Sequence, residues 1–197
     1  MKTWLITGCP AGLGKSLARV VKMAQEHFGG IDVLANNAGY GRRAAVEEGN
    51  SADTGQLFRT NFWGPVELIK EVLPGMRARC SGTVINVSSI AALRTSPGSG
   101  YYADSKSALE SLSDGLRIEV APLGIRVLVV APGAFRTEFA GRSLTQSATA
   151  IADYEGTAGA RSPITGICSI SLSRPTPLPA RRPTGSATLW STRAASR

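Results

Sequence analysis

The sequence predicts an α/β protein with a parallel sheet of about four strands joined by helical crossovers, and two observations predict it. Several short runs are rich in Val, Ile and Leu, which is typical of strands buried on both faces. These runs alternate with longer segments whose apolar residues recur at three- and four-residue spacing, as on a helix. Such alternation favours parallel strands, because the chain must cross the sheet between them. The 197 residues suffice for one ordinary domain, which we place at residues 1–160.

Each expected element follows from a local pattern. The strands are the apolar runs at residues 4–7, 33–36, 83–87 and 126–130. The helices are the periodic segments at residues 14–28, 53–79 and 101–121. A bend is expected near Gly64-Pro65 in the second helix, because proline cannot donate the helical hydrogen bond.

Residues 161–197 form a segment of different composition. They contain five prolines and six arginines, no lysine, no acidic residue and no periodic apolar face. Such a segment buries too little to offset the entropy of ordering it, so we expect an irregular or disordered basic tail. The composition is also that of a GC-rich gene translated out of frame, a hypothesis that the DNA sequence would test.

Composition excludes several classes of protein. The net charge of +8 comes mostly from the tail; residues 1–160 hold 16 basic and 14 acidic residues, a net charge of +2, so the domain has no nucleic-acid footprint. No apolar run is long enough to span a membrane, and no signal peptide is recognised. The three cysteines form neither a disulfide framework nor a zinc module. We therefore expect a cytoplasmic protein without a metal site.

Two motifs at strand ends are typical of nucleotide binding. Thr7-Gly8-x-x-x-Gly12-Leu13-Gly14 lies between the first strand and the first helix, where glycines and helix N–H groups can hold a pyrophosphate. Asn36-Asn37-Ala38-Gly39 ends the second strand, at the sheet edge where ligands bind. Alone, the first is equally consistent with an ordinary loop and the second with an Asn-Gly turn.

A third motif carries acid–base chemistry. Tyr102 and Lys106 are four residues apart, so they share a helix face, and Ser89 follows the third strand. A free tyrosine has a pKa near 10, and a nearby cation lowers it. Alone, this spacing is far more often a solvated helix face than a catalytic pair. A fourth motif, Pro132-Gly133-x-x-x-Thr137, places a hydroxyl after the last strand.

Taken together and in order, these motifs resemble the short-chain dehydrogenase/reductase family of single-domain Rossmann oxidoreductases. Asn61, in Thr60-Asn61-Phe62-Trp63-Gly64, also matches this family. The resemblance covers residues 1–21 and about 22–155. It implies an NAD(P)-dependent oxidoreductase that transfers a hydride between a nicotinamide cofactor and a secondary alcohol or ketone. It also implies a homodimer or homotetramer assembled through the two long helices.

The resemblance implies a role for each matched residue. Tyr102 would exchange a proton with the substrate, Lys106 would lower the pKa of Tyr102 and hold the nicotinamide ribose, and Ser89 would hydrogen-bond the developing alkoxide. Asn61 would hold the water of a proton relay. The cofactor would contact the pyrophosphate-side residues Gly8, Gly12, Leu13 and Gly14, the adenosine-side residues Asn36, Ala38 and Gly39, and the carboxamide-side residues Pro132, Gly133 and Thr137.

The sequence departs from the family between the glycine turn and Asn36. The family has a helix, a strand, a helix and another strand there, whereas residues 15–35 have room for one helix and one strand. We infer a deletion fused near residues 20–22. Asp32 precedes its strand, so we interpret it as a strand-entry residue rather than a ribose ligand. The choice between NAD and NADP is therefore not encoded in a recognisable residue.

The deletion has a structural consequence. If the first two strands are adjacent, their single right-handed crossover helix covers only one face of the sheet, and the other face loses its cover. One alternative is therefore an inactive truncated relative with impaired cofactor binding. The weakest alternative is a partner- or nucleic-acid-binding protein that uses the arginine tail, which lacks interleaved aromatic residues apart from Trp190.

Overall fold

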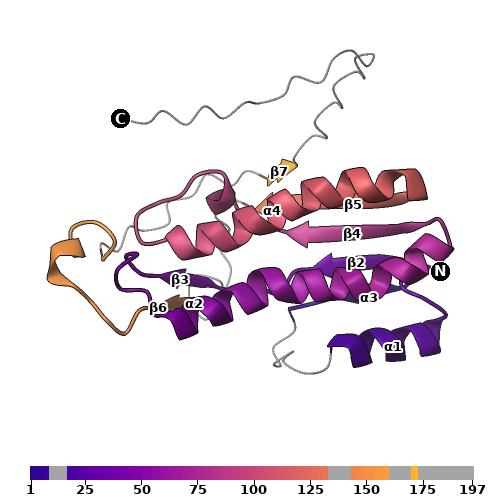
Figure 1. Cartoon of the computed structure of the whole chain (residues 1–197), viewed down its shortest axis with the longest axis horizontal. Helices are drawn as coiled ribbons and strands as arrows, with labels where there is room; N and C mark the ends of the chain where they lie inside the picture. Colours follow the sequence, from indigo (N-terminus) through magenta and orange to yellow (C-terminus); the bar gives the residue numbers. More distant parts are fainter. Residues whose placement is uncertain (9–16, 133–142, 160–169, 173–197) are drawn as a thin grey trace, which may run out of the picture.

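The computed structural model describes residues 1–8, 17–132, 143–159 and 170–172. Its main feature is a five-stranded sheet in the order β1-β2-β4-β5-β7, in which all pairs are parallel except β5 with β7 (Figure 1). The strands are β1 (Trp4–Ile6), β2 (Val33–Asn36), β4 (Gly82–Val87), β5 (Ile125–Pro132) and β7 (Ile170–Leu172). The predicted parallel α/β fold is confirmed.

The helices lie where the periodicity places them. They are α1 (Leu17–Phe28), α2 (Ser51–Phe58), α3 (Gly64–Ala78) and α4 (Gly100–Val120). A π-helical turn, Arg59–Trp63, joins α2 to α3 directly before Gly64-Pro65. The bend expected at this pair stays a prediction. Short 3-10 turns follow at Ile90–Ala92, Ala121–Leu123 and Ala152–Tyr154. No helix among the described residues is long and apolar enough to cross a membrane.

Three short strands were not expected. Strands β3 (Gly41–Arg43) and β6 (Leu144–Gln146) form a separate parallel pair. Within the predicted tail, Ile170–Leu172 forms β7 beside the end of β5, so the prediction of irregular structure is wrong for these three residues. The rest of the predicted tail lies outside the described residues, and a domain boundary at residue 160 stays a prediction.

Strand β1 lies directly beside β2, and α1 is the only element between them among the described residues of that stretch, 1–8 and 17–36. Asp32 enters β2: its carboxylate accepts from the Thr3 N–H at 2.8 Å, and its carbonyl accepts from the Thr83 N–H at 2.9 Å. The interpretation of Asp32 as a strand-entry residue is confirmed. A single crossover thus replaces the longer excursion expected of a complete family member.

One face of the sheet carries the core. Its buried residues come from the strands and from α1, α3 and α4 together, so these helices cover the same face (Figure 1). The cluster comprises Val21, Ile31, Leu34, Leu68, Ile69, Val72, Met76, Val84, Leu116, Val120, Ile125 and Val127. The crossover helix therefore shares a face with the two long helices, as right-handed connection requires.

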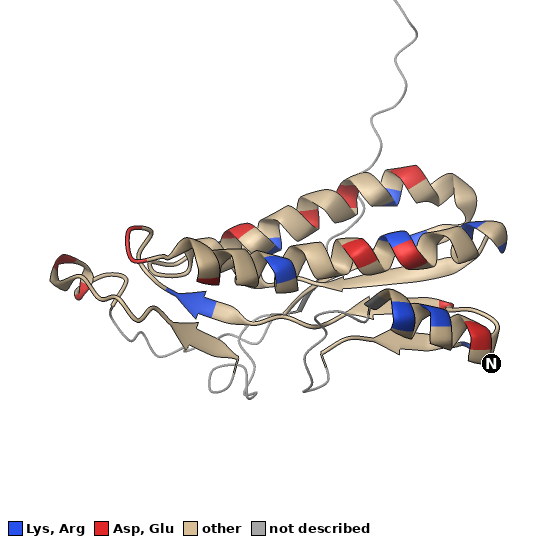
Figure 2. Cartoon of the chain, turned by 60° about the horizontal axis from the view of Figure 1, so that its bottom comes forward, with Lys and Arg blue, Asp and Glu red and all other residues tan. Residues whose placement is uncertain are grey.

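The opposite face is apolar and is covered by no helix of the described residues. Ile6, Ala35, Ile85 and Leu128 are partners across β1, β2, β4 and β5 and form one row on this face. Trp4 and Ile6 are each 55% exposed and Leu128 is 45% exposed, whereas Val127, which faces the helices, is 4% exposed. Figure 2 shows charged residues on helices and connecting loops, with the five-stranded sheet almost free of them. The expected loss of cover is confirmed for the described part of the chain.

Two leucines on opposite faces test this asymmetry. Leu34 is fully buried among the helices, and we expect Leu34→Ala to lower the free energy of unfolding by about 2–5 kcal/mol. Leu128→Ala removes the same atoms from the open face, and we expect a loss below about 1 kcal/mol. Urea unfolding of both variants measures the difference. Equal losses would show that Leu128 is packed against another part of the chain or a partner.

Candidate active site

The carboxyl ends of the parallel strands meet at one sheet edge, and Thr7 joins the first two of them. Its N–H donates to the Ala35 carbonyl at 3.0 Å, and its Oγ1 accepts from the N–H groups of Asn37 and Ala38, each at 3.0 Å. The Asn37 side chain donates back to the Thr7 carbonyl at 3.1 Å. The turns after β1 and β2 are therefore fixed relative to each other.

Glycine is required at two positions of this edge for different reasons. Gly8 has φ +106°, a conformation that strains any other residue, and a Cβ there would lie 2.5 Å from Asn37 Nδ2 and displace that amide. A Cβ on Gly39 would lie 3.1 Å from Lys106 Nζ and 3.2 Å from Asn61 Oδ1. Gly39 therefore lets the Asn-Asn-Ala-Gly turn approach helix α4 closely.

Tyr102, Ser89 and Lys106 converge at the same edge. Ser89 follows β4, accepts from the Ala91 N–H at 3.2 Å and hydrogen-bonds the Tyr102 side chain. Tyr102 is half-buried in the first turns of α4. Lys106, one turn further, is 4% exposed, and its Nζ donates to the Val87 carbonyl at 2.8 Å. A phenol, a hydroxyl and an ammonium group are thus assembled between β4 and α4.

Burial sets the proton affinities of this cluster. It raises the pKa of Tyr102 above its ordinary value, and the hydrogen bond with Ser89 opposes this shift. It also lowers the pKa of Lys106 to about 8, because the charged form is removed from water. The expected net lowering of the Tyr102 pKa by Lys106 is not found: burial of the phenol dominates, and the ammonium group is directed to Val87.

Asn61 links the π-helical turn to both neighbouring elements. Its Nδ2 donates to the Tyr40 carbonyl at 2.9 Å and to Ser105 Oγ at 3.0 Å, and its Oδ1 accepts from the Tyr40 N–H at 3.1 Å. Ser105 Oγ in turn donates to the Tyr102 carbonyl at 2.8 Å. Both N–H donors of the Asn61 amide are used within the protein, so its side chain has none left to offer a water molecule.

A second buried polar chain crosses the interior beneath the site. Asn36 Nδ2 donates to Asn86 Oδ1 at 2.8 Å, and Asn86 Nδ2 donates to Ser113 Oγ at 2.8 Å. Asn36 is 1% exposed, and its side chain is buried between the sheet and α4. The predicted contact of Asn36 with the adenosine side of a cofactor stays a prediction and would come from its backbone. This chain fixes the end of β2 against β4 and α4.

The structure places part of the predicted site and leaves part outside. It brings together Ser89, Tyr102, Lys106 and Asn61, with Gly8, Ala38 and Gly39 at the same edge and Pro132 at the end of β5. Gly12, Leu13, Gly14, Gly133 and Thr137 lie outside the described residues. Sequence reasoning missed the bridging roles of Thr7 and Ser105, although both lie inside motifs it quoted.

Comparison with known proteins agrees with this geometry. A sequence model of the family described as short chain dehydrogenase matches residues 14–148. The chain belongs to this family. The matched residues include Asn61, Ser89, Tyr102 and Lys106, whereas Gly8 and Gly12 precede them.

Individual family members are similar over part of their length. Oxidoreductase claN of Passalora fulva is 46% identical over 121 residues, which are 61% of this chain and 55% of that protein. A short-chain dehydrogenase from Streptomyces avermitilis superposes with a TM-score of 0.68 at 40% identity, covering 73% of this chain and 54% of the other.

Two superposable structures contain a dinucleotide. NAD⁺-bound xylitol dehydrogenase has a TM-score of 0.57 at 31% identity and covers 60% of this chain and 46% of the other. ElxO with NADP bound has a TM-score of 0.57 at 31% identity and covers 58% and 47%. The chain thus spans about half the length of the proteins that it matches.

Proposed function

We propose that the chain is an NAD(P)-dependent oxidoreductase that interconverts a secondary alcohol and a ketone. The observation that carries the proposal is the convergence of Tyr102, Ser89 and Lys106 at the carboxyl edge of a parallel sheet. Ligands bind at this edge in open α/β sheets. Family members with NAD⁺ or NADP bound support the class of cofactor.

The residues present fit the nicotinamide half of such a cofactor. The close approach at Gly8 leaves bare backbone at the end of β1, and the Lys106 ammonium lies between β4 and the turn at Gly39, where a ribose hydroxyl would find a donor. When bound, the nicotinamide supplies or accepts the hydride. Ala38 and Gly39 would contact the adenosine side through their backbones, and Pro132 would border the carboxamide.

The chemistry left to the protein is proton transfer and alignment. Tyr102 donates its phenolic proton to the substrate oxygen during reduction and recovers it during oxidation. Ser89, already hydrogen-bonded to Tyr102, donates to the same oxygen as negative charge develops on it. Lys106 stabilises the resulting phenolate by its positive charge. Asn61 holds Tyr40 and Ser105 and thereby orients α4.

Replacing Tyr102 with phenylalanine tests this assignment. We expect Tyr102→Phe to lower kcat by about 10²–10⁴-fold, because the proton donor is lost. Binding of the reduced cofactor should change less than about twofold, since the ring remains. Turnover over an alcohol and ketone panel and fluorescence titration with NADH and NADPH measure both quantities. Tyr101→Phe is the matched control, because its hydroxyl donates to the Val46 carbonyl outside the site. Unchanged kcat in Tyr102→Phe would contradict the proposal.

A second candidate is an inactive relative with impaired cofactor binding. The observation that favours it is the direct passage from α1 to β2, because residues 29–32 leave no strand to present a ribose-reading side chain. A wild-type protein that melts cooperatively but binds neither NADH nor NADPH would support this candidate. Assembly through α2, α3 and α4 into a homodimer or homotetramer stays a prediction, as does a cytoplasmic location.

A further inference from the structure

Residues 143–159, which we name the strap, lie across the end of the molecule from β6 to the turn before α4 (Figure 1). None of these residues is buried. Apolar packing therefore contributes little to their attachment, and their position depends on hydrogen bonds.

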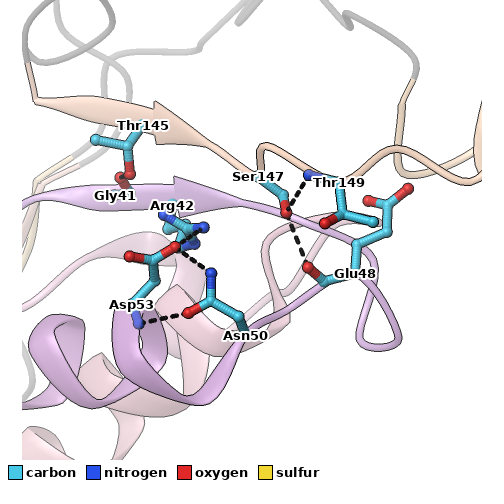
Figure 3. A network of polar contacts seen from close by, with 8 residues as sticks. All are labelled: Gly41, Arg42, Glu48, Asn50, Asp53, Thr145, Ser147 and Thr149. Carbon is cyan, nitrogen blue, oxygen red and sulfur yellow. Dashed lines mark hydrogen bonds and ion pairs between the residues drawn. The ribbon is translucent and has the colours of Figure 1, made fainter.

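The strap is bound to residues 41–48, which we name the platform. The Gly41 N–H donates to the Ser143 carbonyl at 2.7 Å, and the Ser147 N–H donates to the Arg43 carbonyl at 2.9 Å, at the two ends of the β3–β6 pair. The platform is itself anchored, because Arg42 forms an ion pair with Asp53 of α2 (Figure 3). The platform thus offers the strap an anchored surface.

Glu48 makes the central contacts between platform and strap. Its Oε1 accepts from the Ile151 N–H at 2.9 Å, and its Oε2 accepts from the Ala45 N–H at 2.9 Å. Its backbone carbonyl accepts from Ser147 Oγ at 2.8 Å (Figure 3). Hydrogen bonds from Ile151 and Ala45 hold the pKa of Glu48 below its ordinary value, so the carboxylate is ionised at neutral pH. One residue thus connects its own turn to two points of the strap.

The far end of the strap reaches the turn that precedes helix α4. Tyr154 donates its hydroxyl to Glu47 Oε2 at 2.8 Å, and Gly98 lies against the Ala158 backbone. The Gly98 carbonyl accepts from the Ala44 N–H at 2.9 Å, so platform, strap and this turn meet at one point. Tyr102 lies only four residues after Gly98 in the chain. The strap therefore borders the end of α4 that carries the phenol.

We propose that Glu48 is a positioning residue that holds the strap as a wall of the substrate site and thereby sets substrate affinity. The inference rests on the proposed oxidoreductase function. Glu48 contacts the platform and the strap rather than Tyr102, Ser89 or Lys106, so its loss leaves the proton-transfer groups in place. The effect of its removal falls on KM, with kcat retained.

Glu48→Ala and Glu48→Gln test the proposal, with Glu119→Gln as the matched control. Glu119 is an exposed acidic residue of α4 with no hydrogen bond to a described residue. Hydrogen exchange of peptides covering residues 144–154 reports on the strap directly. We expect exchange at Ile151 to accelerate at least about tenfold in Glu48→Ala, and less in Glu48→Gln, which keeps one acceptor. KM should rise about fivefold or more with kcat within about twofold.

The outcomes separate this inference from the proposed function. Accelerated exchange with unchanged KM overturns the role in substrate binding, and unchanged exchange overturns the role of Glu48 in holding the strap. A fall in kcat as large as that in Tyr102→Phe would show that Glu48 acts on the proton-transfer groups instead. Absence of turnover in the wild-type protein overturns the proposed function and the effect on KM, whereas exchange still tests the attachment of the strap.

Discussion

Lys106→Met is expected to lower turnover and to change how stability depends on pH. Burial lowers the pKa of Lys106 to about 8 from 10.5, so between these two values the unfolded chain binds more protons than the folded chain. The stability of the wild-type protein therefore rises with pH in this window. Below pH 8 the full penalty of burying the charge, about 3 kcal/mol, is present in the wild type and absent from the variant.

At high pH, loss of the hydrogen bond to Val87 makes Lys106→Met less stable than the wild type. A neutral lysine still donates to that carbonyl, whereas methionine leaves it unpaired at a cost of about 1–3 kcal/mol. We therefore expect the variant to match or exceed the wild type in stability at pH 7 and to be less stable at pH 10.5. The free energy of unfolding of the variant minus that of the wild type should fall by about 3 kcal/mol between pH 7 and pH 10.5.

Urea unfolding at several pH values measures this crossover. Lys70→Met is the matched control, because Lys70 is exposed on α3 and should show no such dependence. Parallel stability curves for Lys106→Met and the wild type would contradict burial of a charged amine at this position. Turnover of the variant should fall by at least about 10²-fold, because the variant lacks the ammonium group that we propose stabilises the phenolate formed during proton transfer.

Asn61→Ala is expected to be strongly destabilising as well as poorly active. Asn61 is fully buried and satisfies both the N–H and the carbonyl of Tyr40. Its removal leaves these backbone groups unpaired and opens a cavity, for a loss of about 2–5 kcal/mol. Ser105→Ala should cost less, about 1–3 kcal/mol, because it leaves one buried N–H of the Asn61 amide without an acceptor, whereas the Tyr102 carbonyl to which Ser105 donates lies within helix α4.

Urea unfolding and steady-state kinetics of these two variants show whether Asn61 stabilises the fold or takes part in a proton relay. We expect the Asn61→Ala midpoint to fall well below that of Ser105→Ala. If Asn61→Ala unfolds like the wild type but loses turnover, its side chain acts in the reaction itself rather than by holding Tyr40. The structure favours a large loss of stability in Asn61→Ala, because both N–H donors of the Asn61 amide are already used within the protein.

The elements that the sequence predicts well are those set by local pattern. Strand β2 coincides with the predicted residues 33–36, because the short length of this apolar run and the Asn-Ala-Gly turn that follows it favour a strand over a helix. Strands β3 and β6 were missed, since Gly41–Arg43 and Leu144–Gln146 are short and pair only through a contact between distant segments. Strand β7 was missed for the same reason, because its partner is the end of β5.

In the candidate site, too, some features follow from local sequence pattern and others depend on packing. The positions of Tyr102 and Lys106 on one turn of α4 follow from helical spacing, and those of Ser89 and Gly39 follow from parallel strand ends. The hydrogen-bond partner of Lys106 could not be predicted, because it is the backbone carbonyl of Val87, and every residue has such a carbonyl. The direction of the Tyr102 pKa also depends on burial, which only the packed structure supplies.

Strand β1 ends the described sheet and has β2 as its sole neighbour there, through three residue pairs. Two of its three side chains project from the uncovered face, so little apolar contact holds it in place. Such a strand detaches by local fluctuation before the domain as a whole unfolds. Because Thr7 and Gly8 follow β1 directly, each detachment also takes the start of the predicted pyrophosphate-binding turn away from Asn37 and Ala38. We therefore expect dinucleotide binding to weaken with temperature before the domain unfolds.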